Sequence, residues 1–282
     1  GGGGGRASSG RGMGECTCAR GGGGVRFRDA DGPSHVLITG ASGGIGLALA
    51  QAYAAPGIVL SLAGRDPARL EQVAELCRAR GASVQTIALD VRDREALMAW
   101  VRARDDLHPV DRVIANAGVA STQTPTGPGE GWAEIEAVME VNLLGALATI
   151  HPLADRMAVR GRGRIGLMSS LGAYAGMPIS PAYNASKAAL KIYGEGLRGW
   201  LAPRGVGVTV ICPGFVDSAM SQRYPGPMPF KWSAEKAAAR IREGLERNRA
   251  VVAFPWPLGL AMRLLGWLPT DWSLALQRLF RY

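Results

Sequence analysis

The chain has 282 residues, of which 47% are hydrophobic and 20% are charged, and its formal net charge is +9. The hydrophobic fraction is sufficient for a buried core, and the charged fraction is typical of a globular protein. The positive charge comes mostly from arginines scattered along the chain, whereas a nucleic-acid-binding protein usually gathers them on one face or in one run. We therefore expect no nucleic-acid partner.

The cysteines and histidines do not form a metal-binding pattern. Cys16 and Cys18 are separated by one residue, not by the two of a typical zinc site, and His35, His108 and His151 are far apart in the sequence. We expect no metal and free thiols in a reducing compartment, which favours a cytoplasmic location.

Residues 1–34 differ in composition from the rest of the chain. They contain two unbroken glycine runs, 1–5 and 21–24, and almost no apolar residues. Such a segment cannot bury enough surface to offset the entropy lost on ordering, so we predict a disordered tail. It also lacks the apolar stretch of a secretory signal.

From Val36 onward, short apolar runs alternate with helical stretches. Asp66 followed by Pro67 is typical of a helix N-terminus, with the aspartate as the cap. Strands are predicted near 36–39, 58–63, 83–89, 111–115, 164–169, 206–212 and 250–254, and helices near 44–55, 67–80, 93–104, 132–159, 183–202 and 233–247.

This alternation predicts the α/β class, with a parallel sheet that helices cover on both faces. We expect a single doubly wound Rossmann-type domain over residues 35–255, with a mostly seven-stranded parallel sheet. In such a sheet, ligands bind at the carboxyl ends of the strands.

A glycine-rich loop follows the first predicted strand. Its sequence is Gly40-Ala41-Ser42-Gly43-Gly44-Ile45-Gly46, and a helix is predicted directly after it. Glycines allow the backbone to approach a pyrophosphate, and the helix N-terminus directs free N–H groups at it. The loop therefore predicts a dinucleotide site.

The residues after the second predicted strand bear on which dinucleotide is bound. An acid at this position would bind the ribose 2′-hydroxyl of NAD, whereas an arginine suits the 2′-phosphate of NADP. Here Arg65 follows Gly64, and Asp66 is explained as the helix cap. We expect NADP with Arg65 as the phosphate contact, and NAD remains the alternative.

Tyr183 and Lys187 are four residues apart and so share one helix face. We expect the lysine ammonium, together with the positive nicotinamide ring, to lower the pKa of the tyrosine so that it can exchange a proton with a substrate oxygen. Ser170 follows a predicted strand, where its hydroxyl can hold that oxygen.

Taken together, these motifs resemble the short-chain dehydrogenase/reductase family between about Val36 and Phe254. The spacing of 13 residues from Ser170 to Tyr183 is typical of that family. The further markers are Asp90-Val91, Asn116-Ala117-Gly118, Asn142 and Pro213-Gly214.

The resemblance implies a role for each marker. The catalytic residues would be Asn142, Ser170, Tyr183 and Lys187, with Asn142 holding a water in a proton relay with Lys187. The cofactor contacts would be the loop residues Gly40 to Gly46, Arg65, Asp90 and Val91 beside the adenine, Asn116, Ala117, Gly118, Tyr183, Lys187, Pro213, Gly214, Val216 and Ser218. Family members that use NADP often carry a basic residue in the glycine loop, where this chain has Gly43. The resemblance also implies a homo-oligomer.

Residues 223–230 form a proline-rich loop that we expect to act as a lid over the substrate. Residues 256–282 are rich in tryptophan and leucine and are predicted to form a helical extension. Three interpretations of this extension remain open: it packs on the domain or a partner subunit, it walls the substrate pocket, or it lies on a membrane surface. The loop and the extension look similar to bacterial family members of envelope or capsular polysaccharide pathways.

The sequence therefore predicts an NAD(P)-dependent oxidoreductase that transfers hydride between NADPH and a carbonyl or alcohol substrate. The alternatives are a non-catalytic nucleotide-binding regulatory or scaffold protein, and a membrane-peripheral reductase recruited by its C-terminal extension.

Overall fold

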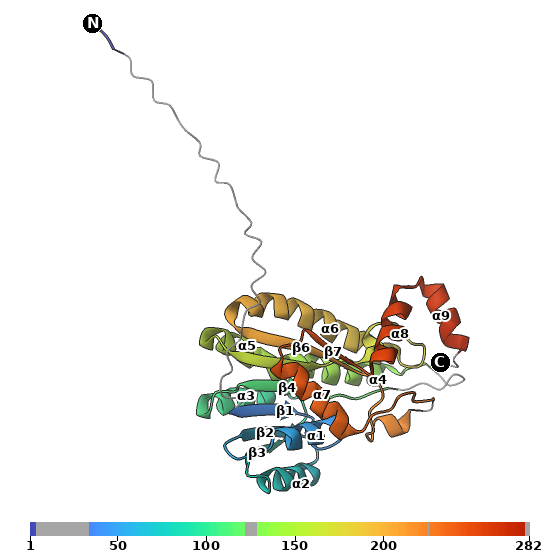
Figure 1. The fold of residues 1–282 in the computed structure, drawn as a ribbon, viewed down its shortest axis with the longest axis horizontal. Coiled ribbons are helices and arrows are strands. Elements are labelled where there is room, and N and C mark those ends of the chain that lie inside the picture. The colour runs from blue at the N-terminus through green and yellow to red at the C-terminus, as the bar shows by residue number, and fades with distance from the viewer. Residues whose placement is uncertain (4–33, 122–128, 225, 280–282) are drawn as a thin grey trace.

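The computed structural model describes residues 1–3, 34–121, 129–224 and 226–279 (Figure 1). The predicted disordered tail, with Cys16 and Cys18, lies almost entirely outside the described residues, as does Pro225 of the predicted lid.

A seven-stranded sheet with the order β3-β2-β1-β4-β5-β6-β7 forms the centre of the fold, and every neighbouring pair of strands is parallel. This confirms the predicted fold class and the position of all seven strands. The strands are β1 (His35–Thr39), β2 (Val59–Gly64), β3 (Ser83–Ala88), β4 (Arg112–Ala115), β5 (Gly163–Met168), β6 (Val206–Pro213) and β7 (Val251–Phe254).

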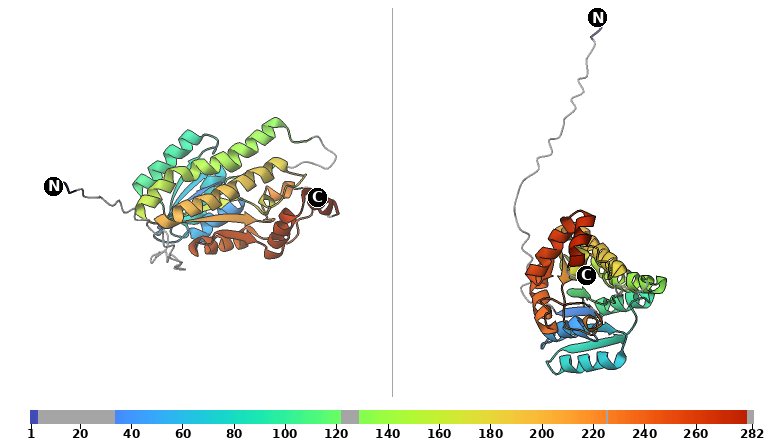
Figure 2. Two further views of the ribbon diagram at one scale, coloured as in Figure 1. Left: turned by 90° about the horizontal axis from the view of Figure 1, so that it is seen from above. Right: turned by 90° about the vertical axis from the view of Figure 1, so that its right-hand side faces the viewer.

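Two layers of helices cover the sheet (Figures 1 and 2). Helices α1, α2 and α7 pack on one face, and α3, α5 and α6 pack on the other, each around its own apolar cluster. The helices are α1 (Gly44–Tyr53), α2 (Pro67–Arg78), α3 (Arg94–Leu107), α4 (Trp132–Met139), α5 (Ala146–Arg160), α6 (Pro181–Leu201), α7 (Ala234–Glu246), α8 (Trp256–Trp267) and α9 (Thr270–Leu279).

Local signals explain several boundaries. The Asp66 carboxylate accepts a hydrogen bond of 3.0 Å from the Arg69 amide, and Pro67 is the first residue of α2. This confirms that Asp66 caps the helix.

The helix predicted over 132–159 contains an irregularity that the sequence did not indicate. A π-helical segment, Glu140–Gly145, joins α4 to α5. The continuous stretch Trp132–Arg160 has the length and hydropathy of a membrane span, but 61% of its most apolar window is buried in the fold. Burial of this kind is usual for a core helix.

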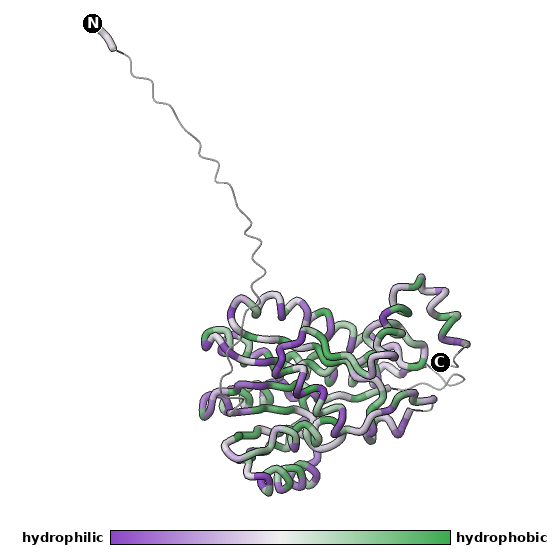
Figure 3. The backbone as a smooth tube through the Cα atoms, in the orientation of Figure 1, coloured by the Kyte–Doolittle hydropathy of each residue, from purple (hydrophilic) through white to green (hydrophobic). Residues whose placement is uncertain are grey.

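The residues after β7 form α8 and α9, and hydrophobic positions recur along both helices (Figure 3). Helix α8 packs on β7 and on the 3₁₀ turn η2 (Leu171–Ala173) that follows β5. The extension thus lies against the end of the sheet where the strands terminate, so it is placed to contribute to any site there.

Candidate functional site

One large cavity, of about 1610 Å³, lies at the carboxyl ends of the strands. Its lining extends from the glycine loop after β1, past the ends of β5 and β6, to the C-terminal helices. This is the position at which a doubly wound sheet binds its ligand.

Most of the residues that the sequence predicted for the site line this cavity. They are Gly40, Ser42, Gly43, Gly44, Ile45, Arg65, Asp90, Val91, Asn116, Ala117, Gly118, Ser170, Tyr183, Lys187, Pro213, Gly214, Val216 and Ser218. Three expected residues do not line it: Ala41, Gly46 and Asn142.

The glycine loop has the geometry needed to hold a phosphate. Helix α1 begins at Gly44 with no side-chain cap and no acid in its first turn, so its free N–H groups are directed at the cavity. A Cβ on Gly43 would meet no atom within 4 Å, which leaves open space beside the loop. A dinucleotide pyrophosphate therefore fits here.

Ala41 and Gly46 support the loop from behind. Ala41 is fully buried in the core, and its amide donates to the Ala63 carbonyl at 3.0 Å. A Cβ on Gly46 would lie 2.1 Å from the Gly40 oxygen, so only glycine lets α1 pack this closely. The structure shows a packing role at these two positions, and a cofactor contact there stays a prediction.

Asn116 braces the same loop. Its side-chain Nδ2 donates to the carbonyls of Thr39 at 3.1 Å and Gly40 at 3.0 Å. The amide thus ties the end of β4 to the end of β1.

The end of β2 carries two arginines beside the cavity. Arg65 and Arg69 both line it. Asp90, which follows β3, pairs with Arg92, whose guanidinium donates to the Asp90 carboxylate at 2.7 Å. That hydrogen bond is the main cause of the lowered pKa of Asp90, and Arg65 adds a smaller effect. The region is therefore suited to an additional anionic group.

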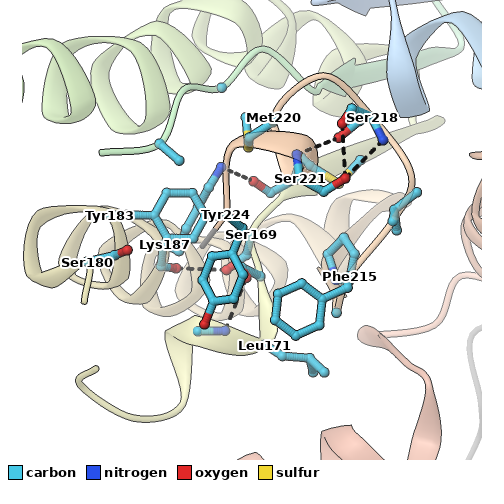
Figure 4. Close-up of a pocket in the computed structure, with 18 of the residues that line it drawn as sticks. Ser169, Leu171, Ser180, Tyr183, Lys187, Phe215, Ser218, Met220, Ser221 and Tyr224 are labelled. Carbon is cyan, nitrogen blue, oxygen red and sulfur yellow. Dashed lines mark hydrogen bonds between the residues drawn. The ribbon is translucent and has the colours of Figure 1, made fainter. Parts of the chain in front are cut away.

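Tyr183, Lys187 and Ser170 all line the cavity, and Figure 4 shows Tyr183 beside Lys187. Tyr183 and Lys187 lie one turn apart on α6, and the Lys187 Nζ is 5.6 Å from the centre of the tyrosine ring. Lys187 is 3% exposed, and its Nζ donates to the Met168 carbonyl at 2.8 Å. The Ser170 Oγ accepts from the Gly172 amide at 3.1 Å, which leaves its own hydrogen free to donate.

The expected lowering of the Tyr183 pKa is not found in the protein alone. Burial raises the pKa of Tyr183, and a hydrogen bond with Ser170 opposes this rise. Burial also lowers the pKa of Lys187 to about 8. In the protein alone both groups are desolvated, and Lys187 is hydrogen-bonded to a carbonyl. The expected lowering depends also on the positive nicotinamide ring, so for the site with its cofactor it stays a prediction.

Asn142 is fully buried in the π-helical segment, beneath the loop after β4. Its amide both donates to and accepts from the backbone of Val119, at 2.9 and 2.8 Å, and donates to the Ser186 hydroxyl at 3.1 Å. Its side chain therefore positions the loop beside Lys187, and the water that it is expected to hold stays a prediction.

The part of the cavity away from the glycine loop is lined by segments whose position the sequence did not specify. Phe215, Met220 and Tyr224 come from the loop after β6 (Figure 4), and the proline-rich segment from Pro227 to Pro229 lies beside them. The predicted lid thus lies at the cavity wall, and its motion stays a prediction.

Both C-terminal helices also line the cavity, through residues such as Leu258, Met262 and Leu276. Of the three interpretations of this extension, the structure supports packing on the domain and walling of the pocket at once. The sequence showed only an apolar helical pattern, which does not say which helix face turns inward.

The sequence analysis also missed Arg69 as a lining residue of the cavity. Its place in the first turn of α2, shortly after Arg65, was a usable signal.

Two glycines of α8 offer a test of how this wall is held. A Cβ on Gly266 would lie 2.1 Å from the Tyr174 backbone oxygen, whereas one on Gly259 would meet Ala253 and Leu171 at 3.6 Å. We expect Gly266→Ala to lower the free energy of unfolding by about 1–3 kcal/mol, because the helix must move. Gly259→Ala should be neutral or stabilising by up to about 1 kcal/mol. Urea denaturation of the two variants checks this, and equal stabilities would contradict the packing described here.

Comparison with known proteins agrees with this geometry. The family described as short chain dehydrogenase matches residues 34–227. An uncharacterized oxidoreductase of Myxococcus xanthus is 36% identical over 234 residues, which cover 83% of this chain and 92% of that protein.

Solved structures share the fold. A short-chain dehydrogenase from Sphingobium yanoikuyae in complex with NADPH has a TM-score of 0.71 at 25% identity, covering 83% of this chain and 96% of that one. An alcohol dehydrogenase from Thermococcus sibiricus complexed with 5-hydroxy-NADP has a TM-score of 0.69 at 28% identity, covering 78% and 94%.

Proposed function

Because the chain belongs to the short-chain dehydrogenase family and is therefore an oxidoreductase, we propose that it reduces a carbonyl substrate with NADPH, using Tyr183 as the acid. The observation that carries the proposal is the convergence of Tyr183, Lys187 and Ser170 in the cavity that the glycine loop also lines.

In this mechanism, Ser170 and Tyr183 both donate hydrogen bonds to the carbonyl oxygen. A bound nicotinamide cofactor supplies the hydride that the carbonyl carbon accepts, so that NADPH becomes NADP⁺. The oxygen takes the proton of Tyr183, and C=O becomes CH–OH. Because burial keeps Tyr183 protonated, the residue is ready for the reductive direction.

Lys187 and the glycine loop position the cofactor. The buried ammonium of Lys187 can donate to the nicotinamide ribose, while the N–H groups at the start of α1 face the pyrophosphate. Arg65 and Arg69 both line the cavity after β2, and either guanidinium would suit the 2′-phosphate.

We expect Arg65→Ala to weaken NADPH binding by about tenfold or more, as for loss of a charge-assisted hydrogen bond, and to leave NADH binding unchanged. Fluorescence titration of both cofactors checks this. Arg102→Ala, an exposed arginine of α3 outside the cavity lining, controls for net charge.

Equal affinity of the wild type for NADPH and NADH would argue for an NAD-linked dehydrogenase. Binding of neither cofactor would favour a non-enzymatic role.

A second candidate, a reductase that lies on a membrane surface, is favoured by one observation. Trp256, Trp267 and Trp272 on α8 and α9 are 76%, 84% and 70% exposed. Tryptophan is enriched at membrane interfaces, and the chain is basic.

We expect the protein to float with vesicles that contain phosphatidylglycerol, and the triple variant Trp256→Ser, Trp267→Ser, Trp272→Ser to remain largely in the unbound fraction. Trp132→Ser, which removes a tryptophan that is 75% exposed on α4, is the matched control. Flotation that is equal in all three proteins would reject the tail as the membrane contact.

A further inference from the structure

The cavity is larger than a single ligand requires. Pockets for small molecules usually measure roughly 300–1,000 Å³, whereas this cavity measures about 1610 Å³. The glycine loop, Arg65 and Asp90 occupy one end, and the loop after β6 with the C-terminal helices forms the other. The second end therefore has space for a sizeable substrate beside the cofactor.

The wall of that second end is mostly apolar and carries no charged side chain among its described residues. Among the described residues from Pro213 to Gln277, none of those that line the cavity is an aspartate, glutamate, lysine or arginine. The charged side chains of the lining are Arg65, Arg69, Asp90 and Lys187, which belong to the cofactor end and the reaction centre. A phosphate or carboxylate in the second end would be desolvated without a partner, which is costly.

The apolar wall begins next to the reaction centre. Leu171, which follows Ser170, is buried and packs in one cluster with Met262, while Leu258 and Leu265 of α8 pack against that cluster. A chain attached to a carbonyl held by Ser170 and Tyr183 would thus meet hydrocarbon side chains from its first carbons.

Polar contacts hold the helices of this wall in place. The Gln277 Nε2 of α9 donates to the Gly176 carbonyl at 3.1 Å, and the Arg263 guanidinium of α8 donates to the Tyr174 hydroxyl at 3.2 Å. Both partners lie in the segment between β5 and α6. The second end is therefore a built pocket and not a gap beside a loose tail.

We propose that the substrate is an uncharged carbonyl compound with a long hydrocarbon chain, with its carbonyl at Tyr183 and Ser170 and its chain against Leu171, Phe215 and α8. The inference rests on the proposed function and uses the same reaction. Its quantitative consequence is that each methylene buried in the pocket strengthens binding about fourfold.

The test is binding of straight-chain methyl ketones, from hexan-2-one to decan-2-one, to the full chain saturated with NADP⁺, which cannot reduce them. We expect the dissociation constant measured by calorimetry to fall on the order of 200-fold across the series, and kcat/KM with NADPH to rise in parallel. A dissociation constant that does not fall with chain length would overturn the proposal.

A pair of leucine variants on α8 locates the effect. Leu265 lines the cavity, whereas Leu260 is exposed outside it. We expect Leu265→Trp to weaken decan-2-one binding by about tenfold or more and to leave hexan-2-one unchanged, because the added ring takes the space of the chain. Leu260→Trp should behave as the wild type.

If Leu265→Trp does not fold, as judged by circular dichroism, Leu265→Ala replaces it and should shift the preference to longer ketones. Unchanged chain-length preference in the folded variant would overturn the proposal.

The two levels of the hypothesis fail differently. Chain-length-dependent binding without any turnover would sink the proposed reductase reaction and keep the apolar subsite. Turnover of short ketones, with no increase in affinity or kcat/KM for longer chains, would keep the reductase reaction and reject the apolar subsite.

Discussion

Replacement of Tyr183 by phenylalanine is expected to lower kcat about a thousandfold, within the range of about 10²–10⁴ that general acid catalysis contributes. The ring that lies beside Lys187 is kept, so only the hydroxyl is lost. The dissociation constant of NADPH should change little, because the loop after β1 and the ends of β2 and β4 still hold the cofactor.

Steady-state rates with the best ketone of the series, together with NADPH titration, check this result. Tyr193→Phe is the matched control, because Tyr193 lies on the same helix and does not line the cavity. A Tyr183→Phe enzyme with wild-type kcat would show that the proton comes from another group.

Lys187 should make cofactor binding depend on pH. Burial lowers the pKa of Lys187 to about 8, so its side chain is a cation below that pH and neutral above it. The cation attracts the anionic cofactor and donates to its ribose. Affinity for NADPH should therefore be highest below about pH 8 and fall as pH rises, by up to about tenfold per unit. Binding should in turn raise the pKa of Lys187.

The variant Lys187→Met is expected to bind NADPH weakly at all pH values from about 7 to about 9.5 and to lose about 100-fold in kcat. Lys191→Met is the control, since Lys191 lies one turn further along α6 and pairs with Glu195 at 2.7 Å. A wild-type affinity that is constant over this pH range would contradict the role of the ammonium.

The apolar end of the cavity also bears on the resemblance to envelope polysaccharide enzymes. A sugar nucleotide would bring phosphates to a wall that offers no charged side chain among the described lining residues after β6. The hydrocarbon-chain substrate is thus the better fit to the chemistry of the wall, and the ketone series distinguishes the two.

Features that depend on local chemistry could be predicted from the sequence. The seven parallel strands follow from short apolar runs that alternate with helices, and the Asp66 cap follows from an aspartate before a proline. The spacing of Tyr183 and Lys187 places both on one face of a helix wherever that helix lies. The glycine loop is likewise a local signal, since its place between a strand and a helix predicts phosphate binding.

Features that depend on distant neighbours were decided only by the tertiary structure. The pKa of Tyr183 in the protein alone is raised by the burial that its neighbours in the fold impose, which no local pattern indicates. Asn142 turns to the backbone of Val119 because a π-helical turn directs it there. The sequence left three surroundings open for the C-terminal extension, because an apolar helix face does not specify its partner. Contact of α8 with the segment after β5 places the extension at the wall of the cavity.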